Sequence, residues 1–213
     1  MRSILIINPK GGCGKSTIAT NLAAYFASQG SATTLADFDP QRSSLAWLEE
    51  RPDTHNPIVG VEGFESGLRS VPRSTEHLII DAPARAHGRE LGDLLKRAET
   101  IIVPVLPSPI DMKAAARFVE ELLSSSKVAG RKAKVAVVAN RVRDNTLIYE
   151  ELDAYLNALK VPYVAALREA QNYIRAFQRG VGIHELPAYL AWSDQEQWEP
   201  LVKWLGSKRS QPR

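Results

Sequence analysis

The chain has 213 residues, of which 44% are hydrophobic and 24% charged, and its formal net charge is +3. This composition is typical of a folded globular protein and excludes intrinsically disordered and fibrous proteins. Cys13 is the only cysteine, which excludes an internal disulfide, and the apolar run at residues 3–7 is too short for a signal-peptide core or a membrane span. We therefore expect a cytoplasmic protein.

Short aliphatic or β-branched runs alternate with helical patterns along almost the whole chain. The predicted strands span residues 3–7, 33–37, 58–61, 77–81, 100–105, 134–140 and 162–167. Several of these runs are apolar without polar alternation, as expected of strands that are covered on both faces of a parallel sheet. The pattern predicts one α/β domain, residues 1–205, with a mostly parallel β-sheet flanked by helices.

Helical spacing of apolar residues appears between the predicted strands. One helix is expected to begin near Lys15 and to end at Gly30, because glycine is the usual residue just beyond a helix C-terminus. A second is predicted over residues 111–126 with Asp111 as its N-cap, and a third over residues 146–159.

The last part of the chain combines a helix signal with a polar tail. Ser193, followed three residues later by Glu196, forms a capping-box pattern in front of the run "QWEPLVKWL". This pattern predicts that the last helix begins at Ser193. The segment after it, residues 206–213, reads "GSKRSQPR" and is predicted to be a flexible basic tail.

Residues 8–17, "NPKGGCGKST", form a variant of the phosphate-binding loop G-x-x-x-x-G-K-[ST]. Gly14, Lys15 and Ser16 close the motif, but Pro9 occupies the place of its first glycine, and Lys10 follows directly. The segment lies between a predicted strand and a predicted helix, so its N–H groups and the helix N-terminus can converge on an anion. The motif predicts that Lys15 reaches the β- and γ-phosphates and that the Ser16 hydroxyl binds Mg²⁺.

Acidic residues end two further predicted strands. Asp37 and Asp39 lie in "LADFDPQ", and Asp81 lies in "HLIIDAPA". The carboxyl ends of parallel strands open toward the crevice where such sheets bind ligands. One carboxylate there can hold the magnesium shell and another can orient an attacking water. Asp37 has an alternative interpretation as a helix cap or turn residue.

The segments "KGGCGKST", "DFDPQ" and "IIDAPA" together resemble the deviant Walker-type ATPases of the ParA/MinD superfamily over nearly the whole chain. The stretches "NPKGGCGKST" and "IIVPVLPSPIDMKAA" are most similar to the small ParF-like partition ATPases. The resemblance implies a P-loop NTPase fold, ATP and Mg²⁺ as cofactors, and slow hydrolysis of ATP to ADP and phosphate.

The resemblance also implies a role for each motif residue. Lys10 corresponds to the lysine that reaches across an ATP-bound homodimer to the partner's phosphates, Asp39 to the residue that positions water, and Asn140 to the residue that reads adenine. The implied catalytic residues are Lys10, Lys15 and Asp39, and the implied metal-binding residues are Ser16, Asp39 and Asp81. The implied ATP-binding residues are Lys10, Gly11, Gly12, Cys13, Gly14, Lys15, Ser16, Thr17 and Asn140.

Such an ATPase is expected to bind DNA without sequence preference as a dimer, and therefore to associate with the nucleoid. Residues 127–213 carry 14 basic and 9 acidic residues, against 13 and 15 in residues 1–126. A basic half permits DNA binding, although a solvated basic surface is the more common reason for such a bias. The candidate DNA contacts are Arg168, Arg175, Arg179, Lys203, Lys208 and Arg209.

The cargo stays open at this point. Plasmid or chromosome segregation would require a ParB-like partner that stimulates hydrolysis, and positioning of a protein body such as a carboxysome or chemoreceptor cluster would require an adaptor. A MinD-like membrane helix is a third alternative because Trp198, Leu201 and Leu205 share one helical face. Glu196 and Glu199 on the same helix oppose an anionic membrane, so we expect this helix to pack on the domain.

Overall fold

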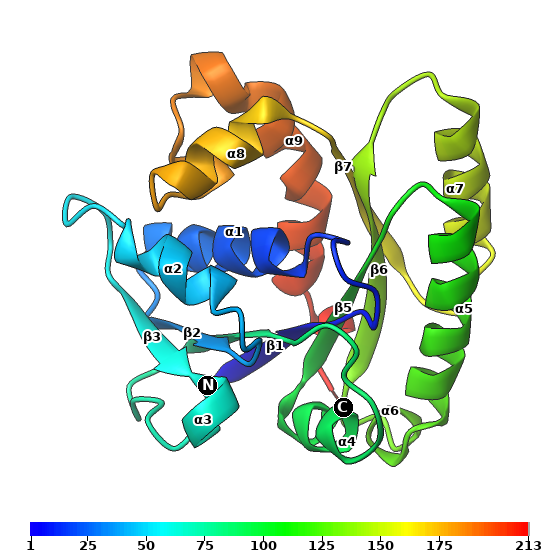
Figure 1. Ribbon diagram of the computed structural model, residues 1–213, viewed down its shortest axis with the longest axis horizontal. Helices are drawn as coiled ribbons and strands as arrows, with labels where there is room; N and C mark the ends of the chain where they lie inside the picture. The colour runs from blue at the N-terminus through cyan, green and yellow to red at the C-terminus, as the bar shows by residue number, and fades with distance from the viewer. Residues whose placement is uncertain (213) are drawn as a thin grey trace.

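The computed structural model describes residues 1–212, apart from the side chain of Ser66. Seven strands form one sheet in the order β3-β2-β4-β1-β5-β6-β7, and every neighbouring pair is parallel (Figure 1). The strands are β1 (Arg2–Ile6), β2 (Thr33–Asp37), β3 (Ile58–Glu62), β4 (His77–Asp81), β5 (Thr100–Val105), β6 (Lys134–Val142) and β7 (Tyr163–Arg168). The predicted parallel α/β fold is confirmed, and each predicted strand lies within two residues of its observed bounds.

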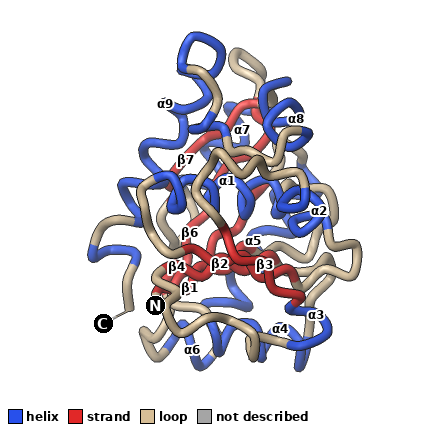
Figure 2. Tube along the Cα trace, turned by 90° about the vertical axis from the view of Figure 1, so that its left-hand side faces the viewer, coloured by secondary structure: helices blue, strands red, loops and turns tan. Residues whose placement is uncertain are grey.

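Helices connect successive strands and cover both faces of the sheet (Figures 1 and 2). The helices are α1 (Lys15–Ser28), α2 (Ser43–Glu49), α3 (Gly63–Ser66), α4 (Gly88–Arg97), α5 (Pro109–Ser124), α6 (Ser126–Ala129), α7 (Leu147–Asn157), α8 (Gln171–Gln178) and α9 (Ala188–Leu205), with short 3₁₀ helices η1 (Ile183–Glu185) and η2 (Lys208–Ser210). The sequence does not predict the shorter helices α2, α3, α4, α6 and α8.

Two hydrophobic cores lie on opposite faces of the sheet. Along β1 the buried side chains alternate between them, with Ile4 and Ile6 in one core and Leu5 in the other. The first core is completed by α1, α2, α8 and α9, and the second by α4, α5 and α7. Because both faces are covered, the central strands bury side chains on both faces, which is why the sequence shows apolar runs without polar alternation.

All carboxyl ends of the strands lie at one edge of the sheet, because the strands are parallel. In the register, Ile6 of β1 and Asp37 of β2 both pair with Asp81 of β4. The loops that follow these three strands therefore leave the sheet side by side. This edge carries the phosphate-loop motif and all three aspartates singled out in the sequence.

Two predicted helix starts are wrong. Helix α5 is capped by Ser108, whose hydroxyl accepts a hydrogen bond from the backbone N–H of Asp111 at 3.3 Å. Pro109 occupies the first turn, where its missing N–H costs nothing, so the helix starts before Asp111. Helix α9 begins at Ala188, and Ser193 lies inside it, because the helix extends toward its N-terminus to bury Ala191 in the core.

The segment after Gly206 differs from the expected flexible tail. The Thr100 hydroxyl donates to the carbonyl oxygen of Ser210 at 2.7 Å, and the Arg2 guanidinium donates to the buried Ser210 hydroxyl. Both partners lie at the amino ends of their strands, so η2 packs at the edge of the sheet opposite the phosphate loop. The sequence does not predict this contact, because its hydrogen bonds are made by the backbone and the hydroxyl group of Ser210 and not by an apolar pattern.

Helix α9 packs on the sheet and uses its apolar face to do so. Trp198, Leu201 and Leu205 are almost completely buried and belong to the first hydrophobic core. Within residues 1–212, no helix combines the length and the apolar composition that crossing a membrane requires.

Candidate functional site

The phosphate-loop motif forms a tight turn between β1 and α1. Gly12 and Gly14 have φ angles of 75° and 90°, a left-handed conformation that side chains disfavour. Gly14 directly precedes α1, and the N–H of Ile18 donates back to its carbonyl oxygen at 3.0 Å. The unpaired N–H groups of the first helical turn thus point toward the loop, which is the arrangement that binds phosphate.

The two lysines of the loop differ in burial and in contacts. Lys15 is 6% exposed, and its Nζ donates to the carbonyl oxygen of Lys10 at 3.1 Å. Lys10 is half-buried, and within residues 1–212 its ammonium group makes no hydrogen bond or ion pair, although its backbone N–H donates to Asn8 Oδ1 at 2.9 Å. Lys15 therefore lies inside the loop, whereas the Lys10 ammonium remains available to a group outside it.

Asn8, for which the motif predicts no role, connects the loop to the sheet. Its buried side-chain amide donates to the carbonyl oxygen of Pro104 in β5 at 2.7 Å and accepts from the backbone of Lys10. The start of the loop is thereby fixed against the neighbouring strand. In the sequence, this role could have been inferred from the position of Asn8 directly after a predicted strand and directly before "PKGG".

Asp81 is completely buried at the carboxyl end of β4. One carboxylate oxygen accepts a short hydrogen bond from the Ser44 hydroxyl, and the other, Oδ1, has no partner within the described residues. Burial raises the pKa of Asp81 to about 7, against the opposing effects of Ser44, Ser16 and Lys15. A buried carboxylate oxygen without a partner, beside the Ser16 hydroxyl, fits Mg²⁺, which prefers such oxygen ligands.

The described residues contain no group of three or more His, Cys, Asp or Glu side chains placed to hold a metal ion. Ser16 and Asp81 alone would leave most of an octahedral Mg²⁺ shell to other oxygens. Mg²⁺ at such sites keeps several waters and binds substrate phosphates together with one or two carboxylates. The donor set therefore fits Mg²⁺ that arrives with a nucleotide.

Asp37 and Asp39 have different partners from Asp81. The Asp37 carboxylate accepts from the backbone N–H groups of Asp39 and Ser44, both at 2.9 Å, so it holds the loop before α2 and acts as a structural cap. The Asp39 carboxylate accepts from the N–H groups of Gln41 at 2.9 Å and Ala84 at 3.2 Å. Asp39 thus bridges the loops after β2 and β4.

Ser44 connects these two aspartates and is absent from the sequence predictions. It is fully buried in the first turn of α2, its N–H donates to Asp37, and its hydroxyl donates to Asp81. Desolvation is the main cause that raises the pKa of both carboxyls, and repulsion from the Asp37 carboxylate raises the pKa of Asp81 further. Serine supplies one donor to each carboxylate, and this compensates the cost of burying them together.

A cavity of about 410 Å³ adjoins the loop on the side of β6 and β7. It is lined by Thr17, Asn140, Arg141, Tyr173 and Phe177, among others. The Asn140 side-chain nitrogen donates to the carbonyl oxygen of Cys13 at 2.8 Å, so the remaining polar atom of this amide, Oδ1, is an acceptor. The cavity combines aromatic and aliphatic side chains with this oriented acceptor, which suits a base that presents an amino group, as adenine does.

The predicted DNA contacts do not form one cluster. Arg168 donates to the fully buried Asp194, which also accepts from Asn172, so its guanidinium is already engaged in an ion pair although its side chain is 37% exposed. Arg175 and Arg179 are exposed on or next to α8, beside the cavity. The exposed cations Lys203, Lys208 and Arg209 lie near the other end of the domain, at the end of α9 and on η2.

Comparisons with known proteins agree with these features. Residues 4–183 match the CobQ/CobB/MinD/ParA nucleotide binding domain. The chain is 27% identical over 192 residues to maintenance of carboxysome distribution protein A of Halothiobacillus neapolitanus, covering 87% of this chain and 88% of that protein. It is 26% identical over 195 residues to protein ParA of Rhizobium radiobacter, covering 87% and 86%.

A solved structure shares the fold over nearly the whole length. An ATP complex of a Cyanothece McdA variant superposes with a TM-score of 0.73 at 18% sequence identity, covering 98% of this chain and 97% of that chain. The family match spans the phosphate loop, both aspartate loops and Asn140. The chain therefore belongs to the CobQ/CobB/MinD/ParA family of nucleotide-binding domains, as its motifs predicted.

Proposed function

We propose that this protein is a Mg²⁺-dependent ATPase that closes into a face-to-face homodimer around ATP. The observation that carries the proposal is the Lys10 ammonium, which has no partner among the described residues although it extends from a loop built to hold phosphates. Two facing triphosphates concentrate negative charge at an interface, and a cation supplied by each partner would offset it. Association would then depend on the γ-phosphate.

Within one subunit, different residues would bind the phosphates, hold Mg²⁺ and orient the attacking water. Lys15 and the N–H groups of the loop would hold the phosphates, and Ser16 with Asp81 would hold Mg²⁺. When bound, Mg²⁺ would neutralise charge on the phosphate oxygens. Asp39 would orient water for attack, and it would do so after exchanging its present backbone donors for that water.

Gel filtration and phosphate release test this proposal. Asp39→Ala should retain the ATP-bound dimer because it binds ATP without hydrolysing it, so ATP and Mg²⁺ should move the variant to the dimer position while phosphate release is lost. Wild-type protein that stays monomeric in ATP and Mg²⁺ and releases no phosphate would overturn the proposal.

The fixed acceptor of Asn140 supports a preference for ATP. Adenine would donate its amino hydrogen to Oδ1, whereas guanine presents a carbonyl at the corresponding position and would leave two acceptors facing each other. We expect competition by GTP to be weaker than competition by unlabelled ATP in a fluorescent-nucleotide displacement assay. Equal displacement by the two nucleotides would contradict this assignment.

The output that we propose is ATP-dependent binding to DNA without sequence preference, and hence association with the nucleoid. The basic groups on and next to α8 and at the end of α9 support it, because exposed cations neutralise phosphates. A gel-shift series on plasmid DNA at rising salt tests it, with Arg175→Ala/Arg179→Ala compared against Lys208→Ala/Arg209→Ala. The double variant that weakens binding and reduces its salt dependence identifies the contacting group, and absence of ATP-dependent binding at low salt removes this part of the proposal.

Cargo movement is the biological role that this cycle would serve, in two candidate forms. Segregation of plasmid or chromosomal DNA with a ParB-like partner is supported by the similarity to protein ParA. Positioning of a protein body through an adaptor is supported by the similarity to two carboxysome distribution proteins, at 27% and 28% identity. The product of the neighbouring open reading frame should stimulate phosphate release, and its binding to DNA or to a protein assembly would decide between the two.

A further inference from the structure

The loop between β4 and α4, residues 82–87, carries an arginine in an unusual conformation. Arg85 has a φ angle of 67°, in the left-handed region that residues with a side chain seldom adopt. Ala82, three residues before it, and Ala86, directly after it, are buried, so the loop is anchored on both sides of Arg85. A strained backbone that the surrounding structure maintains is a reason to look for a function of the side chain that it presents.

Backbone contacts place Arg85 between the two parts of the site. Its N–H donates to the carbonyl oxygen of Pro9 at 3.1 Å, directly beside Lys10 at the start of the phosphate loop. The preceding N–H, that of Ala84, donates to the Asp39 carboxylate at 3.2 Å. The Ala84–Arg85 segment thus lies between the loop expected to hold the phosphates, which Arg85 contacts, and the carboxylate expected to orient water, which Ala84 contacts.

The side chain of Arg85 is not used in the fold. It is exposed, and within residues 1–212 its guanidinium makes no hydrogen bond or ion pair. Arg42 also has a positive φ angle, but it pairs with Glu62, and Arg89 on α4 approaches Asp93 at 3.9 Å. Arg85 therefore presents an uncommitted guanidinium at the edge of the phosphate loop.

We propose that Arg85 contacts the γ-phosphate of the bound nucleotide and stabilises the charge that develops on it during hydrolysis. This inference rests on the proposed ATPase function. A guanidinium can bind two oxygens of one phosphate through parallel N–H bonds. In the transition state, the transferring phosphoryl group spreads its charge over three oxygens. Arg85 would act from the loop after β4, in addition to the two lysines of the phosphate loop.

The contact predicts a kinetic effect that is separate from nucleotide binding. ADP lacks the γ-phosphate, so its affinity should not depend on Arg85, whereas ADP with aluminium fluoride imitates the phosphoryl group in transfer and should depend on it. Loss of the guanidinium should lower kcat at least about ten-fold and weaken the aluminium fluoride complex by a similar factor, while the Kd for ADP stays within about two-fold.

Four variants of the full chain test the inference. Arg85→Gly removes the guanidinium and relieves the positive φ, Arg85→Gln keeps the backbone strain but removes the charge, and Arg85→Lys keeps the charge. Arg131→Gly is the matched control, because Arg131 is exposed, has a φ of 56° and lies just before β6, at the other edge of the sheet. Both glycine variants should gain thermal stability, and only Arg85→Gly should lose kcat.

The expected order of kcat is wild type, then Arg85→Lys, then Arg85→Gln and Arg85→Gly at a similar low level. The inference is overturned if Arg85→Gln retains wild-type kcat and aluminium fluoride affinity, or if ADP affinity falls as much as kcat. A wild-type protein that hydrolyses ATP normally beside an equally active Arg85→Gln would refute the role of Arg85 alone. A wild-type protein without ATP hydrolysis would instead remove the proposed function.

Discussion

The side-chain nitrogen of Asn140 lies 2.8 Å from the carbonyl oxygen of Cys13, so the end of β6 is bonded directly to the phosphate loop. This bond orients the amide that lines the cavity and fixes the loop in the same step. A Cβ atom added to Gly14 would lie 2.1 Å from the same nitrogen. The loop that we propose to hold phosphates and the amide that we propose to read the base therefore share one contact, and that contact requires a glycine.

Gly14→Ala should abolish nucleotide binding. The added methyl group would collide with Asn140 and would also have to adopt a φ of +90°, so both the loop and the amide must move. We expect ADP affinity to fall by about 100-fold or more in a fluorescence titration, because several loop contacts are lost together. Gly92→Ala, in a position of α4 with no atom within 4 Å of the added carbon, is the control and should bind ADP normally. Wild-type affinity in Gly14→Ala would contradict the geometry.

Substitution of the two lysines of the loop should have different effects on nucleotide binding and on dimerisation. Lys15 is buried within the loop, so Lys15→Ala should lose binding of both ATP and ADP. The Lys10 ammonium makes no hydrogen bond or ion pair within residues 1–212, so Lys10→Ala should retain ATP binding but lose the ATP-dependent dimer. Light scattering after gel filtration with ATP and Mg²⁺ measures the dimer, and equilibrium dialysis measures binding. A Lys10→Ala protein that dimerises normally would show that the cation in trans comes from elsewhere.

Most of the sheet could be predicted from sequence because a strand covered on both faces needs apolar residues throughout. The continuous runs in β1 and β4 are therefore strong local signals. Short helices gave no comparable signal. Helix α2 has seven residues, and its start is held in part by the Ser44 hydroxyl bond to Asp81, which joins two residues that only the tertiary fold brings together.

Site residues that belong to a sequence motif could be predicted. Site residues whose role depends on a long-range contact could not. The phosphate loop and Asp81 fall where their motifs placed them, at one edge of the sheet. The role of Ser44 depends on two carboxylates from different strands, and the pairing of Arg168 with Asp194 joins β7 to α9. A basic residue in the sequence does not reveal that a buried carboxylate in a later helix has already engaged it.

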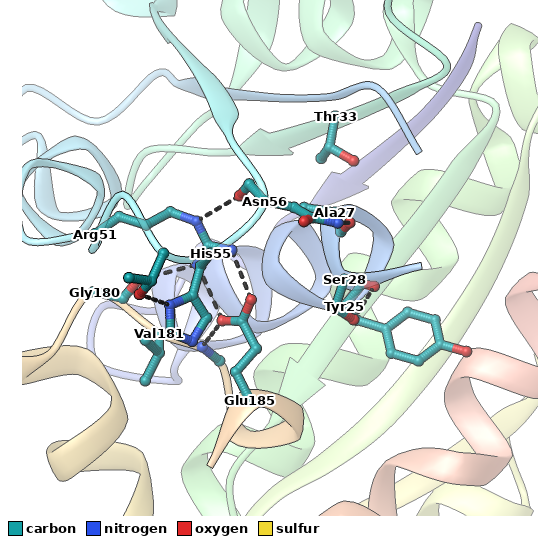
Figure 3. A network of polar contacts seen from close by, with 12 residues as sticks. Tyr25, Ala27, Ser28, Thr33, Arg51, His55, Asn56, Gly180, Val181 and Glu185 are labelled. Atoms are coloured by element: carbon teal, nitrogen blue, oxygen red, sulfur yellow. Dashed lines mark hydrogen bonds and ion pairs between the residues drawn. The ribbon is translucent and has the colours of Figure 1, made fainter. Parts of the chain in front are cut away.

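Removal of Arg51 should destabilise the fold strongly. Arg51 and Glu185 are almost completely buried, and their side chains form two bonds at 2.6 and 3.0 Å, with further bonds to Gly180 and Asn56 (Figure 3). Arg51→Met leaves the Glu185 carboxylate buried without its partner, which should lower the free energy of unfolding by about 3–5 kcal/mol.

A matched surface pair supplies the comparison for this buried one. Arg143 contacts Glu169 at 2.6 Å, but their side chains are 74% and 45% exposed, so Arg143→Met should cost less than about 1 kcal/mol. The double variant Arg51→Met/Glu185→Leu should recover much of the loss, because an apolar pair avoids the unpaired charge. Urea denaturation measures all three, and equal losses for Arg51→Met and Arg143→Met would contradict the role assigned to burial.

His184 should make the fold sensitive to mild acid. Its ring packs against Tyr25 and Trp198, and its buried Nε2 has no hydrogen-bond partner within the described residues. Burial lowers the pKa of His184 to about 4, although Glu185 opposes this effect. The native state therefore holds the neutral ring, while the unfolded chain takes up a proton as the pH falls below about 6.5. The stability conferred by the neutral ring is complete above that pH and is lost progressively between pH 6.5 and 4.

The variant His184→Phe preserves the ring packing and removes the titration. Between pH 7 and pH 5 the wild-type protein should lose about 1–2 kcal/mol more of its unfolding free energy than this variant, after allowance for the partial solvent exposure of the ring. Urea denaturation at the two pH values measures the difference, with His55→Phe as the control at a half-exposed histidine. Because other groups also titrate in this range, the decisive quantity is the difference between wild type and variant. An identical pH dependence in the two proteins would show that the buried imidazole is protonated in the native state without cost.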